Sequence, residues 1–170
     1  MWTGRDARWL LGYLGASFGV AALGSVFTAR SVSTWYRTLH KPAWTPPDRL
    51  FGPVWTVLYA LIGISVWLVR RQAQRHPERA AAAQAAFAAW VVQLALNLAW
   101  SGVFFGGRRT GGGLAVILVL WGSIVTCAVL FARVSRLASA LLLPYLAWTT
   151  FAAVLNGRIW QLNRRPRTYR

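Results

Sequence analysis

The residue types that carry out acid–base and metal chemistry are few in this 170-residue chain. Its three acids (Asp6, Asp48 and Glu78) and two histidines (His40 and His76) all lie outside the long uncharged runs. No carboxylate pair, catalytic triad or proton relay can therefore be built inside those runs. We expect no metal site, because the histidines fall in loops predicted on opposite sides of the protein. His40 as an axial haem ligand is an alternative to an ordinary loop histidine.

Tryptophans and side-chain amides, in contrast, recur at helical spacing within the apolar runs. One stripe comprises Trp90, Gln93, Asn97, Trp100 and Phe104; the others are Trp55, Tyr59 and Ile62 or Gly63, and Tyr145, Trp148, Ala152 and Asn156. Amides and tyrosines in hydrocarbon need polar partners, so we expect these faces to turn toward the interior of a bundle. Two interpretations remain open: tight packing with tryptophan as filler, or a pocket for a flat, apolar ligand.

Five long uncharged runs supply the elements that position these stripes. They are Trp9–Ala29, Leu50–Val69, Ala80–Gly107, Thr110–Ala132 and Leu137–Gly157. Each has the length of a membrane-spanning helix, which needs about 17–25 mostly apolar residues. We therefore predict an all-α integral membrane bundle of five transmembrane helices, forming a single domain over residues 1–170. The alternative, five buried helices of a soluble core, fits the length of the runs poorly.

The composition also argues against a water-soluble globule. Only 13% of the residues are charged and 56% are apolar, whereas soluble domains have about 25% charged residues. The net charge of +16 could indicate a nucleic-acid-binding module. However, the basic residues flank the apolar runs, where they can pair with anionic lipid head groups. The first run could be mistaken for a secretory signal, but it exceeds the usual signal core of about 7–15 residues.

The distribution of basic residues predicts the orientation of the chain in the membrane. The side of the membrane that holds the C-terminus has the larger number of basic residues, so we expect that terminus in the cytoplasm of a bacterial cell.

Small residues predict a turn and a contact between helices. Gly111, Gly112 and Gly113, between the third and fourth spans, predict a flexible turn. The alanine face of Ala81, Ala85 and Ala89 is expected to form the seam of a homodimer, and Gly15 and Gly19 offer a second small-residue face. Packing within one bundle is the alternative.

The connection between the first two spans, residues 30–49, is long and rich in stiff residues. This first loop reads RSVSTWYRTLHKPAWTPPDR and contains two tryptophans, a tyrosine and three prolines. Prolines restrict the backbone, and aromatic rings favour the membrane interface. We expect an ordered lid, with Arg37, Lys41 and Arg49 able to pair with an anionic edge of a ligand. Asp48 is interpreted as a cap for the second helix.

The first loop and the second span resemble the signature of the TspO/MBR family, the tryptophan-rich sensory proteins and translocator proteins that include the peripheral-type benzodiazepine receptor. The resemblance rests on WYRTLHKPAWTPP at residues 35–47 and FGPVWTVLY at residues 51–59. Further matches are QLALNLAWS at 93–101, FFG at 104–106, Trp121, PYLAW at 144–148, Phe151, Ala152, Leu155, Asn156 and Trp160. Together they cover nearly the whole chain.

This resemblance implies a five-helix membrane protein, usually a homodimer in bacteria. The implied ligands are tetrapyrroles such as protoporphyrin and haem, and isoquinoline carboxamide or benzodiazepine drugs. The implied ligand-binding positions are Trp35, Tyr36, Trp44, Trp55, Tyr59, Asn97, Trp100, Trp121, Trp148, Phe151 and Ala152. Animal members carry a cholesterol pattern with a tyrosine after the fifth helix. Residues 155–164 have no tyrosine, so we do not expect cholesterol binding.

Three functions are compatible with this reading. We expect a membrane receptor, sensor or carrier for tetrapyrroles and similar planar ligands, with an aromatic pocket under the first loop and no required cofactor. The alternative is an enzyme that degrades porphyrin with light or oxygen, an activity described for some bacterial family members. Trp55 and Trp148 are then the candidate reactive residues. A membrane packing protein without a ligand is the third possibility, and it predicts no saturable binding.

Overall fold

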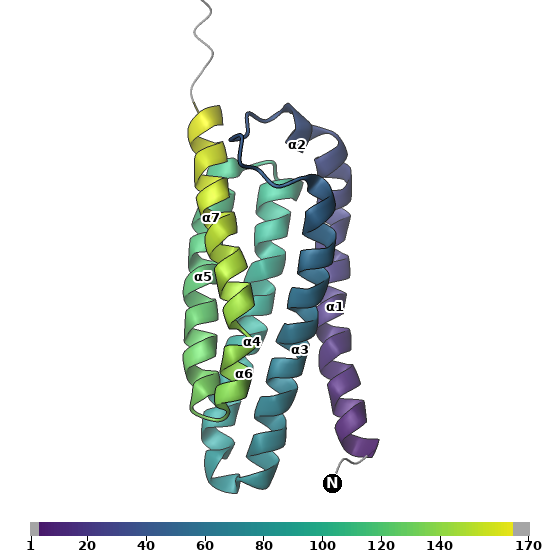
Figure 1. Ribbon diagram of the computed structural model, residues 1–170, viewed down its shortest axis with the longest axis vertical. Helices are drawn as coiled ribbons and strands as arrows, with labels where there is room; N and C mark the ends of the chain where they lie inside the picture. The colour runs from purple at the N-terminus through teal and green to yellow at the C-terminus, as the bar shows by residue number, and fades with distance from the viewer. Residues whose placement is uncertain (1–3, 165–170) are drawn as a thin grey trace, which may run out of the picture.

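The protein is a bundle of long helices that run roughly parallel to one axis (Figure 1). The computed structural model describes residues 4–164. The long helices are α1 (Gly4–Ser33), α3 (Phe51–Arg75), α4 (Ala80–Ser101), α5 (Thr110–Ala132) and α7 (Leu143–Asn163). Shorter helical segments are α2 (Trp35–Thr38), η1 (Asp48–Leu50), η2 (Pro77–Arg79), η3 (Gly102–Gly106) and α6 (Arg136–Ala140). Five segments are long and apolar enough to cross a membrane, which confirms the predicted fold class.

Several helices extend beyond the uncharged runs that mark them in the sequence. Helix α1 begins before Trp9 and continues to Ser33, so the start of the first loop is helical. Helix α3 similarly continues past Val69 to Arg75. Arginine is a good helix former, so a charge that ends an apolar run does not end the helix. The first loop also contains the short helix α2, which leaves residues 39–47 as its non-helical part.

The predicted stripe on the third span faces the interior of the bundle. Its five members, Trp90, Gln93, Asn97, Trp100 and Phe104, are all buried. Helix α4 packs against α5 and α1, while α1 packs against α3, and α5 packs against α7. Spacing of three and four residues places side chains on one helical face, and that face is the one enclosed by neighbouring helices.

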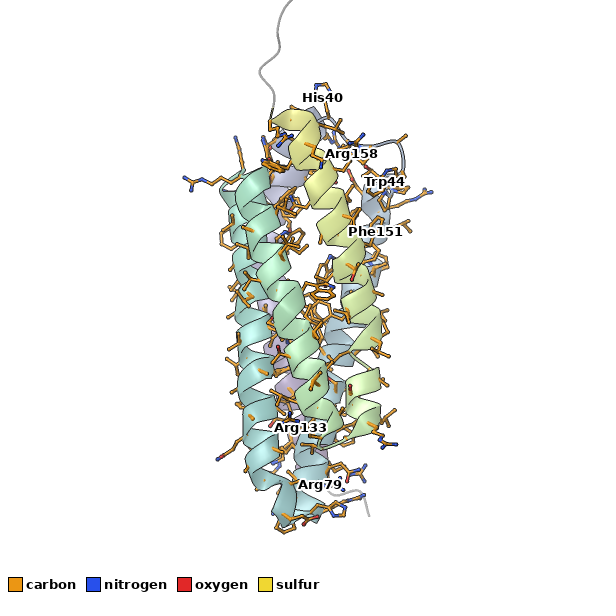
Figure 2. The ribbon with its side chains drawn as sticks, turned by 90° about the vertical axis from the view of Figure 1, so that its left-hand side faces the viewer. His40, Trp44, Arg79, Arg133, Phe151 and Arg158 are labelled. Atoms are coloured by element: carbon orange, nitrogen blue, oxygen red, sulfur yellow. The ribbon has the colours of Figure 1, made fainter. Side chains whose placement is uncertain are left out.

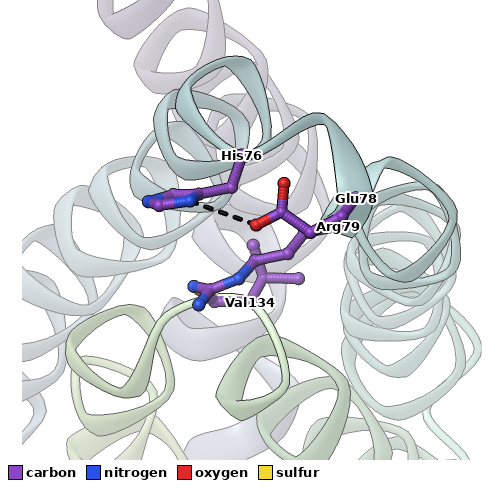
Figure 3. A network of polar contacts seen from close by, with 4 residues as sticks. All are labelled: His76, Glu78, Arg79 and Val134. Atoms are coloured by element: carbon purple, nitrogen blue, oxygen red, sulfur yellow. Dashed lines mark hydrogen bonds and ion pairs between the residues drawn. The ribbon is translucent and has the colours of Figure 1, made fainter.

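The two ends of the bundle carry different connections. Figure 1 shows the first loop, the link between α4 and α5, and the end of α7 at one end, with the remaining turns and the start of α1 at the other. His40 and Arg79 mark these two ends in Figure 2. At the second end, Arg79 Nη1 donates to the backbone oxygen of Val134 at 2.9 Å. His76 Nδ1 lies 3.2 Å from Glu78 Oε1 beside it (Figure 3). The arginine thus ties the turn before α4 to the turn after α5.

The triple glycine does not form the flexible turn that its composition predicts. Gly111, Gly112 and Gly113 belong to the first turn of α5, directly after Thr110. A Cβ atom on Gly113 would lie only 2.6 Å from Phe104 Cδ2 and 3.0 Å from Asn156 Oδ1. The missing side chain therefore allows η3 and α7 to approach α5 closely, and the packing around it holds the segment in a helix.

Substituting Gly113 with alanine is expected to destabilise the bundle. The added methyl group has to displace the buried ring of Phe104, so the free energy of unfolding should fall by about 1–2 kcal/mol. Thermal unfolding in detergent measures the effect. Gly122→Ala is the matched control, because it lies on the same helix and a Cβ there meets nothing within 4 Å. Equal melting temperatures for both variants would contradict the close approach at Gly113.

Candidate ligand-binding site

A cavity of about 560 Å³ lies between α1, α3 and α4, next to α2. Its volume falls within the range of about 300–1,000 Å³ that is typical of small-molecule sites. The lining is mostly apolar or aromatic, with Tyr36, Arg37 and Asp48 as contributions from the first loop. Exposed residues such as Ser25 on α1 and Thr56 on α3 also line it, so the cavity is open to the exterior.

Aromatic rings from α3 and α4 form one wall of the cavity. The rings of Trp55 and Trp100 stack at an angle of 30°, with centroids 6.5 Å apart. Trp55 also contacts Tyr59, at a centroid distance of 5.5 Å, and Trp100 contacts Phe105 at 5.7 Å. Rings packed against one another hold their orientation and present a broad apolar surface.

A polar bridge lies beneath this wall and joins three helices. Tyr59 Oη on α3 donates to Asn97 Oδ1 on α4 at 2.6 Å. Asn97 Nδ2 donates in turn to Tyr145 Oη on α7 at 2.9 Å. All three side chains are buried, so each group relies on the others for its hydrogen bonds. The bridge satisfies the amide that the sequence places on an apolar span, and it fixes the positions of Tyr59 and Asn97 on the cavity wall.

A second polar chain holds the indole of Trp100. Its Nε1 donates to Asn156 Oδ1 on α7 at 3.3 Å. Asn156 Nδ2 donates to the backbone oxygen of Thr110 at 2.8 Å, at the start of α5. Directly after Ser101, helix α4 continues into the π-helical segment η3. Such segments are frequent at functional sites. Here the segment carries Phe104 and Phe105, which pack against Trp100.

The mouth of the cavity carries both charged and neutral polar groups. Arg37 and Asp48 line it, and Lys41 Nζ lies 4.2 Å from the ring centroid of Tyr36. Burial, with a smaller contribution from the carboxylate of Asp48, raises the pKa of Tyr36 to about 12. The phenol is therefore a neutral hydrogen-bond donor at physiological pH. Of the basic residues that the sequence assigns to a ligand, Arg37 lines the cavity, whereas Lys41 and Arg49 do not.

Asp48 lies at the start of the second span, where a carboxylate favours the helix dipole as the sequence suggests, but it does not cap the helix through a hydrogen bond. It belongs to η1, directly before α3, and no side-chain capping hydrogen bond is found at the start of either helix. The first turn of α3 contains Pro53, which lacks one of the N–H groups that a cap would satisfy. Asp48 is exposed and lines the large cavity.

The structure brings together five of the ligand-binding positions implied by the family resemblance. Tyr36, Trp55, Tyr59, Asn97 and Trp100 all line the cavity. Ala152 lines a second cavity of about 30 Å³ on the α7 side. Tyr36, Phe51, Trp100 and Phe105 line both cavities and form the partition between them.

The remaining implied positions lie outside the large cavity. Trp148 packs between Phe51 and Phe151, with centroid distances of 5.8 and 5.4 Å. Trp44 is 49% exposed and its ring lies 5.9 Å from that of Phe151; both are labelled in Figure 2. Trp35 packs on Phe104 at 5.7 Å. Trp121 on α5 is 40% exposed and donates from Nε1 to Thr150 Oγ1 at 2.8 Å.

Helix α1 supplies the wall that sequence reasoning missed. Its contributions include Ala21, Gly24, Ser25, Thr28 and Ala29, all of them small residues. Their spacing of three and four residues places them along one side of the helix. Small side chains leave space instead of filling it, so this face bounds a hollow. In the sequence, small residues recur at this spacing after Phe18, and this pattern could have identified α1 as a wall of the cavity.

The non-helical part of the first loop is fastened to the end of α7. His40 donates from its backbone N–H to Asn163 Oδ1 at 3.1 Å. Asn163 Nδ2 donates back to the backbone oxygen of His40 at 2.9 Å. The imidazole of His40 does not take part in this pair, and it does not line the large cavity. The reciprocal hydrogen bonds hold residues 39–47 across the end of the bundle.

Replacing Asn163 with alanine is expected to loosen the first loop. Losing two hydrogen bonds of about 0.5–1.5 kcal/mol each should accelerate backbone amide exchange around His40 about tenfold. Hydrogen–deuterium exchange with mass spectrometry measures this rate. Gln161→Ala is the control, because Gln161 lies on the same helix and bonds only to Arg158. Unchanged exchange in the Asn163→Ala variant would show that the loop is held by other contacts.

These features define a class of protein: a multi-pass integral membrane protein with an aromatic cavity of ligand size beside an ordered loop. The chain belongs to the TspO/MBR family, whose sequence model matches residues 13–161. It is 43% identical over 150 residues to the tryptophan-rich protein TspO of Chlorobaculum tepidum, covering 88% of this chain and 92% of that protein.

More distant relatives include proteins from animals and from other bacteria. The human translocator protein is 38% identical over 141 residues, covering 83% of this chain and 82% of that protein. The tryptophan-rich sensory protein of Cereibacter sphaeroides is 35% identical over 147 residues, covering 85% of this chain and 88% of its own length. The family inferred from the first loop and its neighbouring helices is thereby confirmed.

Proposed function

We propose that this protein is a membrane receptor, sensor or carrier that binds tetrapyrroles and similar planar, apolar molecules in the large cavity. The observation that carries this proposal is the stacked pair Trp55 and Trp100 on the wall of a 560 Å³ cavity. A flat aromatic wall opposite the small residues of α1 suits a broad, thin ligand. Protoporphyrin and haem are the ligands that the family resemblance suggests.

The groups at the cavity mouth fit the chemistry of a tetrapyrrole edge. Tetrapyrroles carry carboxylates at one edge of an otherwise apolar ring. The guanidinium of Arg37 can pair with such a carboxylate, and the neutral phenol of Tyr36 can donate a hydrogen bond. Asp48 carries a negative charge at the same mouth, so we expect one carboxylate of the ligand to approach on the side of Arg37. The ring then extends toward Trp55.

A titration of protoporphyrin into the purified protein tests this function. We expect saturable binding, which is measured as a shift of the porphyrin absorbance band. The variant Ala21→Phe places a ring in the cavity from α1 and should weaken binding, because it occupies space that the ligand needs. Ala115→Phe on α5 is the control, since Ala115 is exposed and does not line the cavity. Absorbance that rises linearly and equally in all three proteins would indicate partition into detergent and contradict the proposal.

Degradation of the porphyrin is the alternative function. Trp55 favours it, because its indole lies on the cavity wall within a connected set of rings that includes Tyr59 and Trp100. Such rings can give up an electron to an excited or oxidised ligand, and the indoles would then take the role that acid–base groups have in other enzymes. Illumination of the complex in air distinguishes the two functions. A new pigment that requires the protein supports degradation, whereas retained binding without a product supports the receptor.

We further propose a location and an assembly for this receptor. In the full sequence, the side of the membrane that holds the C-terminus has more basic residues than the other side. This excess favours a cytoplasmic C-terminus in a bacterial cell membrane. Arg165, Arg167 and Arg170 of that tail lie outside the described residues. Ala81 and Ala85 are exposed on α4 and suit the seam of a homodimer. Disulfide crosslinking of an Ala85→Cys variant in membranes tests this seam, and failure to crosslink would argue against it.

A further inference from the structure

An arginine stacked on a tryptophan lies at the end of the bundle opposite the first loop. The Cζ atom of Arg70, near the end of α3, is 3.5 Å from the ring centroid of Trp9, near the start of α1. Trp9 stacks in turn on Tyr13, with a centroid distance of 6.2 Å. The two helices thus join through a guanidinium that lies over an indole ring. Stacking of this kind leaves the N–H groups, which lie in the plane of the guanidinium, available for other partners.

The charge of Arg70 has no protein partner within residues 4–164. Its guanidinium makes no hydrogen bond or ion pair there, and Nε is buried without a partner. A buried donor on a charged group normally has an acceptor, because leaving it unpaired is costly. The stacking contact compensates only part of the charge. Arg70 therefore has the character of a binding group whose anion comes from outside the chain.

The surroundings of Arg70 are rich in positive charge. Arg5 and Arg8 on α1 and Arg75 on α3 are exposed near the same end. Asp6 is the acid on this part of α1, and its backbone oxygen accepts a hydrogen bond from Trp67 Nε1 at 3.1 Å. Glu78 is the second acid at this end and lies 3.2 Å from His76. The guanidiniums outnumber the two carboxylates, so the region attracts anions to the vicinity of Arg70.

The position of Arg70 favours a lipid anion over a soluble one. Trp9 is 40% exposed, and tryptophan is enriched at the boundary between head groups and hydrocarbon. Leu11, two residues further along α1, is 67% exposed. Phe87 on α4, whose ring lies 6.2 Å from that of Tyr13, is 43% exposed. Exposed apolar side chains thus occur on the helices around the contact between Arg70 and Trp9, as the acyl chains of a phospholipid would require.

We propose that Arg70, held by Trp9, binds the phosphate of an anionic phospholipid at the N-terminal end of the bundle. The guanidinium fork matches two phosphate oxygens, and the surrounding arginines select a head group with net negative charge. The exposed apolar residues next to Trp9 contact the acyl chains. This site is separate from the large cavity, and it does not depend on which ligand that cavity takes.

Lipid nanodiscs of two compositions test the proposal with the full chain. We compare phosphatidylcholine alone with phosphatidylcholine containing phosphatidylglycerol, and we measure thermal stability and the phosphatidylglycerol retained in native mass spectrometry. The wild-type protein should be stabilised by phosphatidylglycerol and retain it. Arg70→Gln should retain about fivefold less, because one arginine contributes about 1 kcal/mol to binding an anionic lipid.

Two further variants distinguish lipid binding at Arg70 from a general attraction of anionic lipid to the basic protein and from misfolding. Arg158→Gln removes a charge at the opposite end, where Arg158 bonds to Gln161, and should behave as the wild type does. Trp9→Leu keeps the charge of Arg70 but removes its platform, and should also lose retained lipid. Equal retention by Arg70→Gln and Arg158→Gln would overturn the proposal. Stabilisation by soluble glycerol phosphate in neutral nanodiscs would also overturn it, because the site would then bind a free phosphate.

Discussion

Replacing Trp55 with alanine is expected to weaken protoporphyrin binding at least tenfold. Trp55 stacks on Trp100, contacts Tyr59 and Tyr145, and forms the middle of the cavity wall. Truncating a central aromatic anchor typically costs about 2 kcal/mol or more, and about 1.4 kcal/mol corresponds to a tenfold change in affinity. The porphyrin absorbance band is the suitable readout, because removing an indole changes the tryptophan fluorescence itself.

Two other tryptophans serve as controls for this prediction. Trp121→Ala removes an exposed indole on α5, far from the cavity lining, and should leave the affinity within about twofold of the wild type. Trp148→Ala should have a smaller effect than Trp55→Ala, because Phe51 lies between Trp148 and the large cavity. If all three variants weakened binding equally, the loss would reflect general destabilisation, and the assignment of the cavity wall would be wrong.

Asn97→Leu is expected to lower the free energy of unfolding by about 2–4 kcal/mol, because two buried hydroxyl groups each lose a hydrogen-bond partner worth about 1–3 kcal/mol. Asn97 bridges Tyr59 on α3 and Tyr145 on α7 at 2.6 and 2.9 Å. Leucine has nearly the same volume as asparagine but no polar side-chain atom. The fall in the free energy of unfolding therefore reports the lost hydrogen bonds and not a packing defect. Thermal unfolding in detergent or nanodiscs measures the change.

Gln93 provides a matched control on the same helix. It is buried one turn before Asn97, yet neither its oxygen nor its nitrogen has a hydrogen-bond partner within residues 4–164. Gln93→Leu should therefore leave stability unchanged or raise it, since it removes an unsatisfied amide. Equal destabilisation by the two substitutions would mean that the polar bridge contributes nothing specific. Tyr59→Phe should fall between them, because it removes only one of the two hydrogen bonds.

The membrane-spanning architecture could be predicted from sequence because hydrocarbon imposes a simple rule on length. A span must satisfy its backbone internally and cover the membrane, and each of the five runs does so. The buried stripe on α4 was equally readable, because Asn97 and its neighbours repeat at helical spacing. The ends of helices were less predictable. Arg70 and Arg71 close an apolar run, but they continue the helix of α3.

The cavity was predicted only in part, because a hollow is defined by small residues as much as by large ones. The helical spacing of aromatic and amide side chains identified Trp55, Tyr59, Asn97 and Trp100, whereas the small residues of α1, such as Gly24 and Ser25, were not recognised as a cavity wall. The presence of a tryptophan also did not show whether its side chain faces the cavity. Trp121 faces outward because its span presents one side to neighbours and the other to the exterior. Loop contacts such as the pair between His40 and Asn163 join residues too distant in sequence for local patterns to reveal.

A structure of the protein in complex with protoporphyrin would show directly whether the ligand occupies the large cavity. We expect the ring of the ligand between the small residues of α1 and the indoles of Trp55 and Trp100, with one carboxylate near Arg37. The same experiment with the Ala21→Phe variant should show no ligand in that position. A porphyrin found on the outer surface of α5 near Trp121, with the space beside Trp55 unoccupied, would contradict the account.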